Sequence, residues 1–436
     1  MSATTLKWGR TLLNSRGREL LRSSILVFSI SMIGNVANYL YQFAMGRYLS
    51  LPDFGALNAI LSLTMIISVP AATITLVKAK YVARLLLRDA WARIRTVYYE
   101  LLKKTSLFAA VTAAVLLLLS PALRRFLNLA DSWPLILFAV LVFWTLLTAL
   151  NSGFFQGLQR FGVYSALGAG MGITRLVAAV VLVNAGFALR GALGGAILAS
   201  VLIFGVSLLQ ISRLLRPYPR QRDAAQTPLN LFSTAASLFF LTSITYVDMV
   251  LVKHLFQPEE AGIYAGVSVL GKTILYLPGA ITQVLLPKVS GAEPEESFHL
   301  LLSSALLSAG ISLGGVILFY LYPEPLLRLF LGARYHGGAD LLALYAVVML
   351  LFALMTLFVN FCLARDIQDV FRALGIIFAL QTAGLYFLGR SGFTAFLGYM
   401  ILTGLAACVC LFIKIKNGSR TPALASGGDH HPCQED

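Results

Sequence analysis

Residues 46–60 read GRYLSLPDFGALNAI, and residues 253–267 read KHLFQPEEAGIYAGV. Each stretch follows a long apolar segment and carries an acidic residue two positions before a glycine, at Asp53 in the first and Glu260 in the second. The two acids lie 207 residues apart (260 − 53). A recurrence at this distance is typical of a duplicated membrane bundle with a central cleft between its two lobes. We therefore predict an internal repeat.

Two prolines give the repeat a second anchor. Pro70 and Pro278 each lie deep in the second apolar segment of one half, 208 residues apart (278 − 70). A proline inside a helix frees a backbone carbonyl and can bend the helix. We expect both prolines to bend their helices.

Composition places the chain in a membrane. The chain has 436 residues, of which 58% are hydrophobic and 12% charged, and its mean hydropathy is +0.80. Soluble domains carry about 25% charged residues. A bilayer core needs about 20 apolar residues per helix, and only closed backbone hydrogen bonding is tolerated in lipid. The expected fold class is therefore an all-α integral membrane protein.

Twelve apolar segments are long enough to span a bilayer. They are 23–46, 55–77, 105–121, 134–154, 163–186, 191–212, 229–256, 263–286, 299–322, 341–363, 368–389 and 391–413. An even number of spans in each half makes the repeat parallel, with a pseudo-two-fold axis along the membrane normal. We expect two six-helix bundles around a central cleft.

The domain boundaries follow from the same pattern. We expect a cytoplasmic interfacial segment at 1–22, an N-terminal lobe at 23–214, a cytoplasmic linker at 215–228, a C-terminal lobe at 229–414 and a disordered cytoplasmic tail at 415–436.

The positive charges predict the orientation. Most of the 34 Lys and Arg residues fall in segments that share one side with the N-terminus. Cations concentrate on the cytoplasmic side of membrane proteins, so both termini are expected inside. This topology accounts for most of the net charge of +15 without a nucleic-acid partner. Within it, Lys78–Lys104 predicts an amphipathic basic helix that binds anionic membrane lipids.

Charged residues inside a bilayer are costly and usually face a bundle interior or water. Arg175 lies near the middle of the fifth span, in a lobe whose spans contain no Asp or Glu. One interpretation is a brace that donates to backbone carbonyls of a neighbouring helix. The other is a cation facing the cleft, where a guanidinium can bind a pyrophosphate through two parallel hydrogen bonds.

Asp248 and Lys272 form a second candidate site. They flank the outer loop of the second lobe at similar depth, about 12–15 Å at 1.5 Å per helical residue. A structural ion pair is one interpretation. In the other, Lys272 contacts a substrate phosphate and Asp248 takes up a coupling cation or proton.

Amide side chains on the first span form a third candidate site. Asn35, Asn38 and Gln42 are spaced three and four residues apart and so share one helical face. Such amides often join helices through hydrogen bonds. In a cleft the same stripe would bind sugar hydroxyls.

Catalytic and metal sites find little support in the sequence. There is no Walker A motif and no HExxH motif. The four cysteines show neither a disulfide framework nor a CxxC pair, and the tail sequence GGDHHPCQED is interpreted as an unstructured polar segment. We expect a protein that is not an enzyme and that uses no cofactor and no metal.

A family resemblance accompanies these residues. Asp248-Met249-Val250-Leu251 followed by Glu260-Ala261-Gly262 resembles the seventh-span signature of the Wzx-type polysaccharide-biosynthesis flippases, and Gly46-Arg47-Tyr48-Leu49 before Pro52-Asp53 resembles their first hairpin. These proteins belong to the multidrug/oligosaccharidyl-lipid/polysaccharide (MOP) exporter superfamily, which includes the MATE transporters. Lipid II flippases are similar but carry two further C-terminal spans.

The resemblance implies a function. It predicts alternating access between two V-shaped bundles that move an undecaprenyl-pyrophosphate-linked oligosaccharide from the inner to the outer leaflet of the bacterial cytoplasmic membrane. Expected partners are this lipid-linked substrate, membrane lipids, and a glycan polymerase and glycosyltransferases.

Three alternatives stay open from the residues. A multidrug/cation antiporter of the same superfamily would favour acidic cleft residues, yet Asp248 stands against two cations. A membrane scaffold for glycan assembly would tolerate the loss of every cleft charge. An integral-membrane glycosyltransferase would need catalytic acids in larger outer loops.

Overall fold

The computed structural model describes all residues except 1–14, 220–231, 280–293, 366, 368 and 419–436. Most of the predicted interfacial segment, linker and tail therefore lies outside the described residues. The structure is helical throughout the described ranges, with no strand among them. This agrees with the predicted all-α fold class.

Two bundles divide the helices between them. The first contains α2 (Ser15–Tyr48), α3 (Leu51–Leu87), α4 (Trp91–Leu118), α5 (Ser120–Phe126), α6 (Trp133–Gly157), α7 (Phe161–Leu182), the short η1 (Val183–Phe187) and α8 (Ala188–Leu215). The second contains α9 (Phe232–Leu255), α10 (Pro258–Tyr276), α12 (Pro294–Leu321), α13 (Pro323–Phe330), η2 (Ala333–Gly338), α14 (Ala339–Ala364), α15 (Val370–Leu388), η3 (Gly389–Ser391) and α16 (Phe393–Gly418). Within the described residues, a long helix lies in each predicted span, although parts of the spans 229–256 and 263–286 fall outside those residues.

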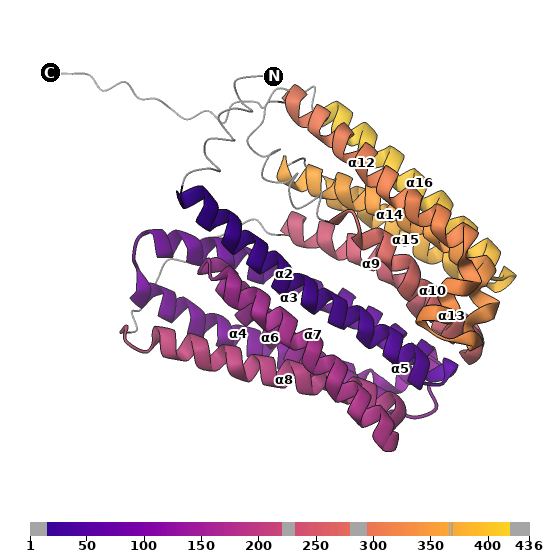
Figure 1. Cartoon of the computed structure of the whole chain (residues 1–436), viewed down its shortest axis with the longest axis horizontal. Coiled ribbons are helices and arrows are strands. Elements are labelled where there is room, and N and C mark those ends of the chain that lie inside the picture. The colour runs from indigo at the N-terminus through magenta and orange to yellow at the C-terminus, as the bar shows by residue number, and fades with distance from the viewer. Residues whose placement is uncertain (1–14, 220–231, 280–293, 366, 368, 419–436) are drawn as a thin grey trace.

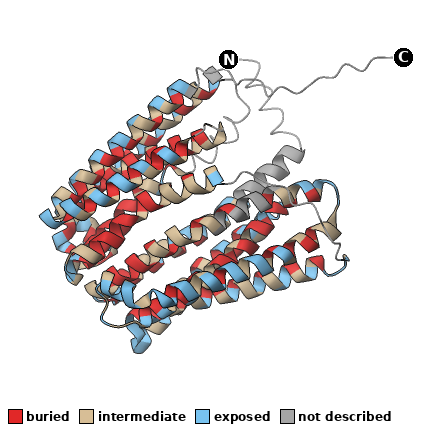
Figure 2. Ribbon diagram, turned by 180° about the vertical axis from the view of Figure 1, so that it is seen from behind, coloured by how far each residue is buried: buried red, intermediate tan, exposed pale blue. Residues whose placement is uncertain are grey.

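The long helices have the length and composition of membrane spans. Among the described residues, nine stretches qualify on these two criteria alone. One of them, Phe161–Leu215, contains the two packed helices α7 and α8. The stretches do not include α2 or α10, and α10 carries three charged residues, Glu259, Glu260 and Lys272. Large apolar side chains remain exposed on the outward faces of the bundles, where lipid would cover them (Figure 2).

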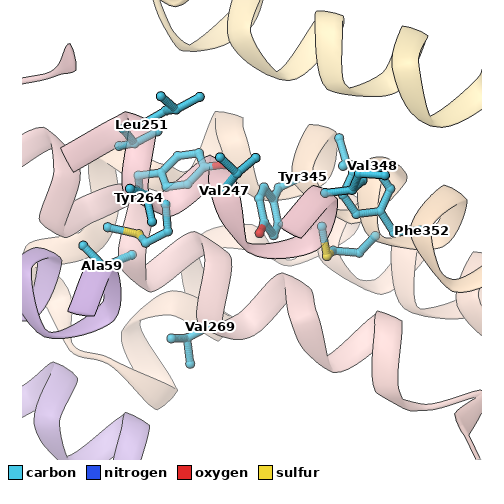
Figure 3. Packing of buried hydrophobic residues seen from close by; sticks show 14 of the residues in the cluster. Ala59, Val247, Leu251, Tyr264, Val269, Tyr345, Val348 and Phe352 are labelled. Carbon is cyan, nitrogen blue, oxygen red and sulfur yellow. The ribbon is translucent and has the colours of Figure 1, made fainter. Parts of the chain in front are cut away.

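The two bundles meet at one end, which we term the junction. There α3 contacts both α9 and α10, and the ends of α2, α5 and α13 lie at the same end (Figure 1). Buried apolar side chains continue from one bundle to the other, with Ala59 of α3 packed near Tyr264 of α10 and Val247 of α9 (Figure 3). The bundles separate toward the opposite end, where α2 begins and α16 ends (Figure 1).

The repeated acid-x-Gly elements lie in the first turns of α3 and α10, although the sequence placed them in loops. Ser50 caps α3: its Oγ accepts from the Asp53 backbone N–H over 3.3 Å, and its hydroxyl donates to Asp53 Oδ2 over 2.8 Å. At α10, the Gln257 backbone N–H donates to Glu260 Oε2 over 3.1 Å. Both acids lie in a first helical turn, where a negative charge is favourable, and Glu260 also accepts a capping hydrogen bond. Their role is structural.

The two repeated glycines contact each other across the junction. A Cβ atom on Gly55 would lie 3.0 Å from the backbone nitrogen of Gly262, and a Cβ atom on Gly262 would overlap the carbonyl oxygen of Leu51. Only hydrogen fits at Gly262, and a Cβ atom at Gly55 would be tight. The α3 and α10 backbones can therefore touch at the centre of the junction.

Replacing Gly262 with alanine should weaken the junction. Because the Leu51 backbone cannot move aside as a flexible side chain would, we expect a cost of about 1–3 kcal/mol, as for other overpacked interiors. Thermal unfolding of the purified protein measures this cost. Gly314→Ala in α12 is the matched control, since nothing lies within 4 Å of a Cβ atom there. Equal unfolding temperatures for the two variants would contradict the close contact.

Two expectations for the helix ends were wrong. The segment Lys78–Lys104 is not one surface helix: α3 continues to Leu87, and α4 begins at Trp91. Asp89 between them has a φ of 52°, a left-handed conformation that Asp tolerates and that ends a helix. Pro70 lies inside α3 as predicted, whereas Pro278 follows the end of α10 rather than bending it.

Candidate functional site

Close packing of α2 against α7 positions Arg175. A Cβ atom on Gly34 would lie 2.9 Å from Ala169 Cα, and one on Gly172 would lie 2.7 Å from the carbonyl oxygen of Gly34. Small residues of this kind let membrane helices approach closely. One turn further along α7, the Arg175 guanidinium carbon lies 3.9 Å from the centre of the Tyr41 ring.

The Arg175 guanidinium has unused hydrogen-bonding capacity. Its Nε and Nη2 atoms are buried and find no hydrogen-bond partner among the described residues. The predicted brace to backbone carbonyls is therefore not formed by these two atoms. Tyr41 stabilises the cation through its ring face while its own hydroxyl donates to the carbonyl of Ala192 over 3.2 Å. Two parallel N–H donors remain free for an anion.

Asp248 occupies the centre of a buried polar network in the second bundle. Its side chain is fully buried, and its Oδ2 accepts hydrogen bonds from the hydroxyls of Tyr264 over 2.9 Å and Tyr345 over 2.8 Å. Ser268 bonds to the Tyr345 hydroxyl over 2.9 Å. Three helices, α9, α10 and α14, are joined by this network.

The structure brings Lys272 and Asp248 together. The Lys272 Nζ lies 3.9 Å from Asp248 Oδ1, an ion-pair distance too long for a hydrogen bond. The same ammonium lies 4.4 Å from the centre of the Tyr246 ring. Lys272 is thus neutralised by a carboxylate within its own bundle. In the described part of the chain, no such counter-charge is paired with Arg175.

The three amides of α2 differ in burial and in hydrogen bonding. Asn35 is exposed, whereas Asn38 donates to the Gly34 carbonyl of its own helix over 3.1 Å and packs against α7. Gln42 is half-buried, and its Oε1 atom has no hydrogen-bond partner among the described residues. They share one helical face as predicted, but each meets different surroundings.

A group of tyrosines beside Lys272 was missed from the sequence. Tyr246 and Tyr276 hydrogen-bond through their hydroxyls, and Tyr39 of the first bundle lies near both. Tyr39 and Tyr246 are 207 residues apart (246 − 39). The same repeat distance that relates Asp53 to Glu260 could therefore have identified them.

The described residues contain no group of three or more His, Cys, Asp or Glu side chains arranged to hold a metal ion. At the candidate sites, the polar groups in the described part of the chain are the Arg175 guanidinium, which has no ion pair there, the Asp248–Lys272 ion pair and several phenol hydroxyls. Such a set can bind an anionic, hydroxyl-rich molecule.

Comparison with solved structures defines the fold. The chain resembles an inward-facing multidrug resistance MATE family transporter of the MOP superfamily, with a TM-score of 0.68 and 13% identity over 92% of this chain and 99% of that chain. It also resembles the lipid II flippase MurJ in an inward closed conformation, with a TM-score of 0.65 and 14% identity over 90% and 87% of the two chains. A MOP superfamily transporter from Pyrococcus furiosus, described by the reverse polarity of its binding pocket, matches with a TM-score of 0.54 and 13% identity over 91% and 96%.

These matches define a multi-pass membrane protein with the two-bundle fold of the MOP transporters. The family model described as polysaccharide biosynthesis protein matches residues 93–340, which is more than half of the chain. The chain therefore belongs to that family, and the predicted relationship to the Wzx-type MOP exporters is confirmed. No curated protein matches the sequence.

Proposed function

We propose that the protein flips an undecaprenyl-pyrophosphate-linked oligosaccharide from the inner to the outer leaflet of the bacterial cytoplasmic membrane. The observation that carries the proposal is Arg175, whose guanidinium is half-buried and, among the described residues, has no carboxylate partner and two buried nitrogens without a hydrogen bond. Leaving a buried charged group unpaired is costly. A pyrophosphate would supply both acceptors and the counter-charge.

The arrangement of the bundles supports a route for this substrate. From the positive-inside pattern we infer that the separated end of the bundles faces the cytoplasm and the junction faces outward. The headgroup enters between the bundles from the inner leaflet, binds Arg175 and contacts the amides Asn35, Asn38 and Gln42, while the polyprenyl tail stays in lipid. The bundles then rock about the junction, as in alternating access.

An organic-cation antiporter is the second candidate, and the charges count against it. Asp248 is the acid that would attract a cation, and Lys272 already neutralises it within 3.9 Å. A coupling role for Asp248 would require a proton or cation to displace this ammonium. For the proposed flipping of a lipid-linked oligosaccharide, by contrast, the expected protein partners are a glycan polymerase and glycosyltransferases.

Reconstituted vesicles test the function. A fluorescent polyprenyl-pyrophosphate-linked oligosaccharide in the inner leaflet should become accessible to a membrane-impermeant quencher once the protein is present. A polyprenyl lipid with a neutral headgroup is the control and should not move. Transport of a quaternary ammonium dye, with no movement of the pyrophosphate lipid, would instead establish the antiporter.

A further inference from the structure

The end of α2 is bonded to the second bundle in both directions. Arg47 donates from Nε to the carbonyl of Phe330 over 3.3 Å and from Nη2 to the carbonyl of Leu329. In return, Arg334 donates to the carbonyl of Gly46 over 2.8 Å and to that of Arg47. Each arginine thus caps the C-terminal carbonyls of a helix in the opposite bundle. We term this set the α2 latch.

The end of α9 is bonded to the first bundle in the same way. The His254 ring bonds through Nδ1 to the carbonyl of Phe126 over 2.7 Å and stacks on the Phe126 ring with 4.1 Å between centroids. Asn128 donates to the carbonyls of His254 over 3.0 Å and Lys253 over 3.5 Å. We term this set the α9 latch.

The two latches are copies related by the internal repeat. The donors Arg47 and His254 differ by 207 residues (254 − 47), as do the acceptors Gly46 and Lys253. The loop side of each latch repeats as well. Leu-Arg-x-Phe-Leu occurs at 123–127 and at 327–331, and each copy is followed by a residue with left-handed φ, Asn128 at 48° and Gly332 at 108°.

We propose that these two latches form a duplicated outer gate that holds the bundles together at the junction and must open in each transport cycle. The proposal rests on the proposed function for its orientation and its cycle. The hydrogen bonds of the two latches are favourable because they form at helix ends. The last carbonyls of a helix lack partners within the helix, and cationic donors placed there are stabilised by the helix dipole.

The latches use carbonyls as acceptors in place of carboxylates. Among the ion pairs in the described ranges, none involves Arg47 or Arg334. When the bundles part, each carbonyl can exchange its protein donor for water, so no buried charge is left without a partner. This arrangement suits a contact that breaks and reforms repeatedly.

Distances between spin labels on the two bundles test the gate. Ala185 in η1 and Ser391 in η3 are exposed, lie in different bundles and belong to neither latch. We place cysteines there, replace the four native cysteines with alanine, and measure the label distance in vesicles without substrate. The open-to-closed ratio should rise about tenfold for Arg334→Ala and about tenfold for Asn128→Gly, as expected for loss of a charged or paired hydrogen bond. The double variant should combine both effects.

The variants are chosen to preserve the backbone. Asn128→Gly keeps the left-handed φ and matches Gly332 in the other repeat. Arg334→Lys keeps the charge with a single donor group, so it should open the junction less than Arg334→Ala. Arg190→Ala is the matched control, because Arg190 bonds to Asp131 within the first bundle over 2.6 Å.

An unchanged distance distribution in the double variant would overturn the gate, and so would an equal opening caused by Arg190→Ala. If Arg334→Ala does not fold, the distances are measured in Arg334→Lys and Asn128→Gly. Both variants must then show an open junction for the gate to stand. The measurement needs no substrate. A gate that opens normally in a protein that moves no pyrophosphate lipid would therefore refute the proposed function and leave the gate intact.

Discussion

Arg175→Ala should reduce flipping of the pyrophosphate-linked lipid by about 100-fold, because truncating one partner of a buried charge pair costs about 2–5 kcal/mol. The folded protein should tolerate the change. In the described structure the guanidinium has no ion-pair partner to lose, and its main contact is the Tyr41 ring. The rate of lipid movement in vesicles, at matched protein insertion, measures the effect.

Two further variants sharpen this result. Arg175→Lys retains the charge but cannot donate two parallel hydrogen bonds, so its rate should fall between those of the parent and the alanine variant. Arg160→Ala removes an exposed arginine next to the start of the same helix and should leave the rate unchanged. Parent-like flipping by Arg175→Ala would remove this residue from the substrate site.

Asp248→Asn should destabilise the protein by about 3–5 kcal/mol, since it leaves the Lys272 ammonium buried without a counter-charge. The asparagine still offers an oxygen to the hydroxyls of Tyr264 and Tyr345, so the loss isolates the charge. Thermal unfolding in detergent measures it. Lys272→Met in the same chain removes the stranded charge and should restore most of the stability.

The double variant also separates structure from transport. A coupling energy computed from the two single variants and the double variant isolates the pair interaction. If the stable double variant flips lipid at the parent rate, the pair is structural. A stable double variant that no longer transports would show that the pair itself takes part in the cycle. Additive losses of stability would contradict the ion pair.

The sequence predicts the number and type of helices well, because twelve apolar segments in lipid have few other solutions. Helix ends are less predictable, since capping depends on single side chains. Asp53 and Glu260 were predicted in loops, yet both lie in the first turn of a helix, where Ser50 caps α3 and Glu260 accepts the backbone N–H of Gln257 at α10. The pattern of Lys78–Lys104 is continuous, and one left-handed residue, Asp89, divides it.

The candidate site was predictable only in part. Buried charges are rare enough in a membrane sequence that Arg175, Asp248 and Lys272 could be named at once. Their partners could not be named, because Tyr41, Tyr264 and Tyr345 are ordinary residues whose role depends on three-dimensional packing. The latches were also missed, since their acceptors are backbone carbonyls that no side-chain pattern reveals.

The carbonyl groups of the latches give the outer gate a dependence on its solvent. In the closed junction, Arg47, Arg334, Asn128 and His254 serve as their donors. Once the bundles part, water must take over these bonds, so the open gate holds more water than the closed one. Solutes excluded from protein surfaces favour compact states. In the proposed orientation, excluded solutes in the medium outside the cell therefore favour the closed gate.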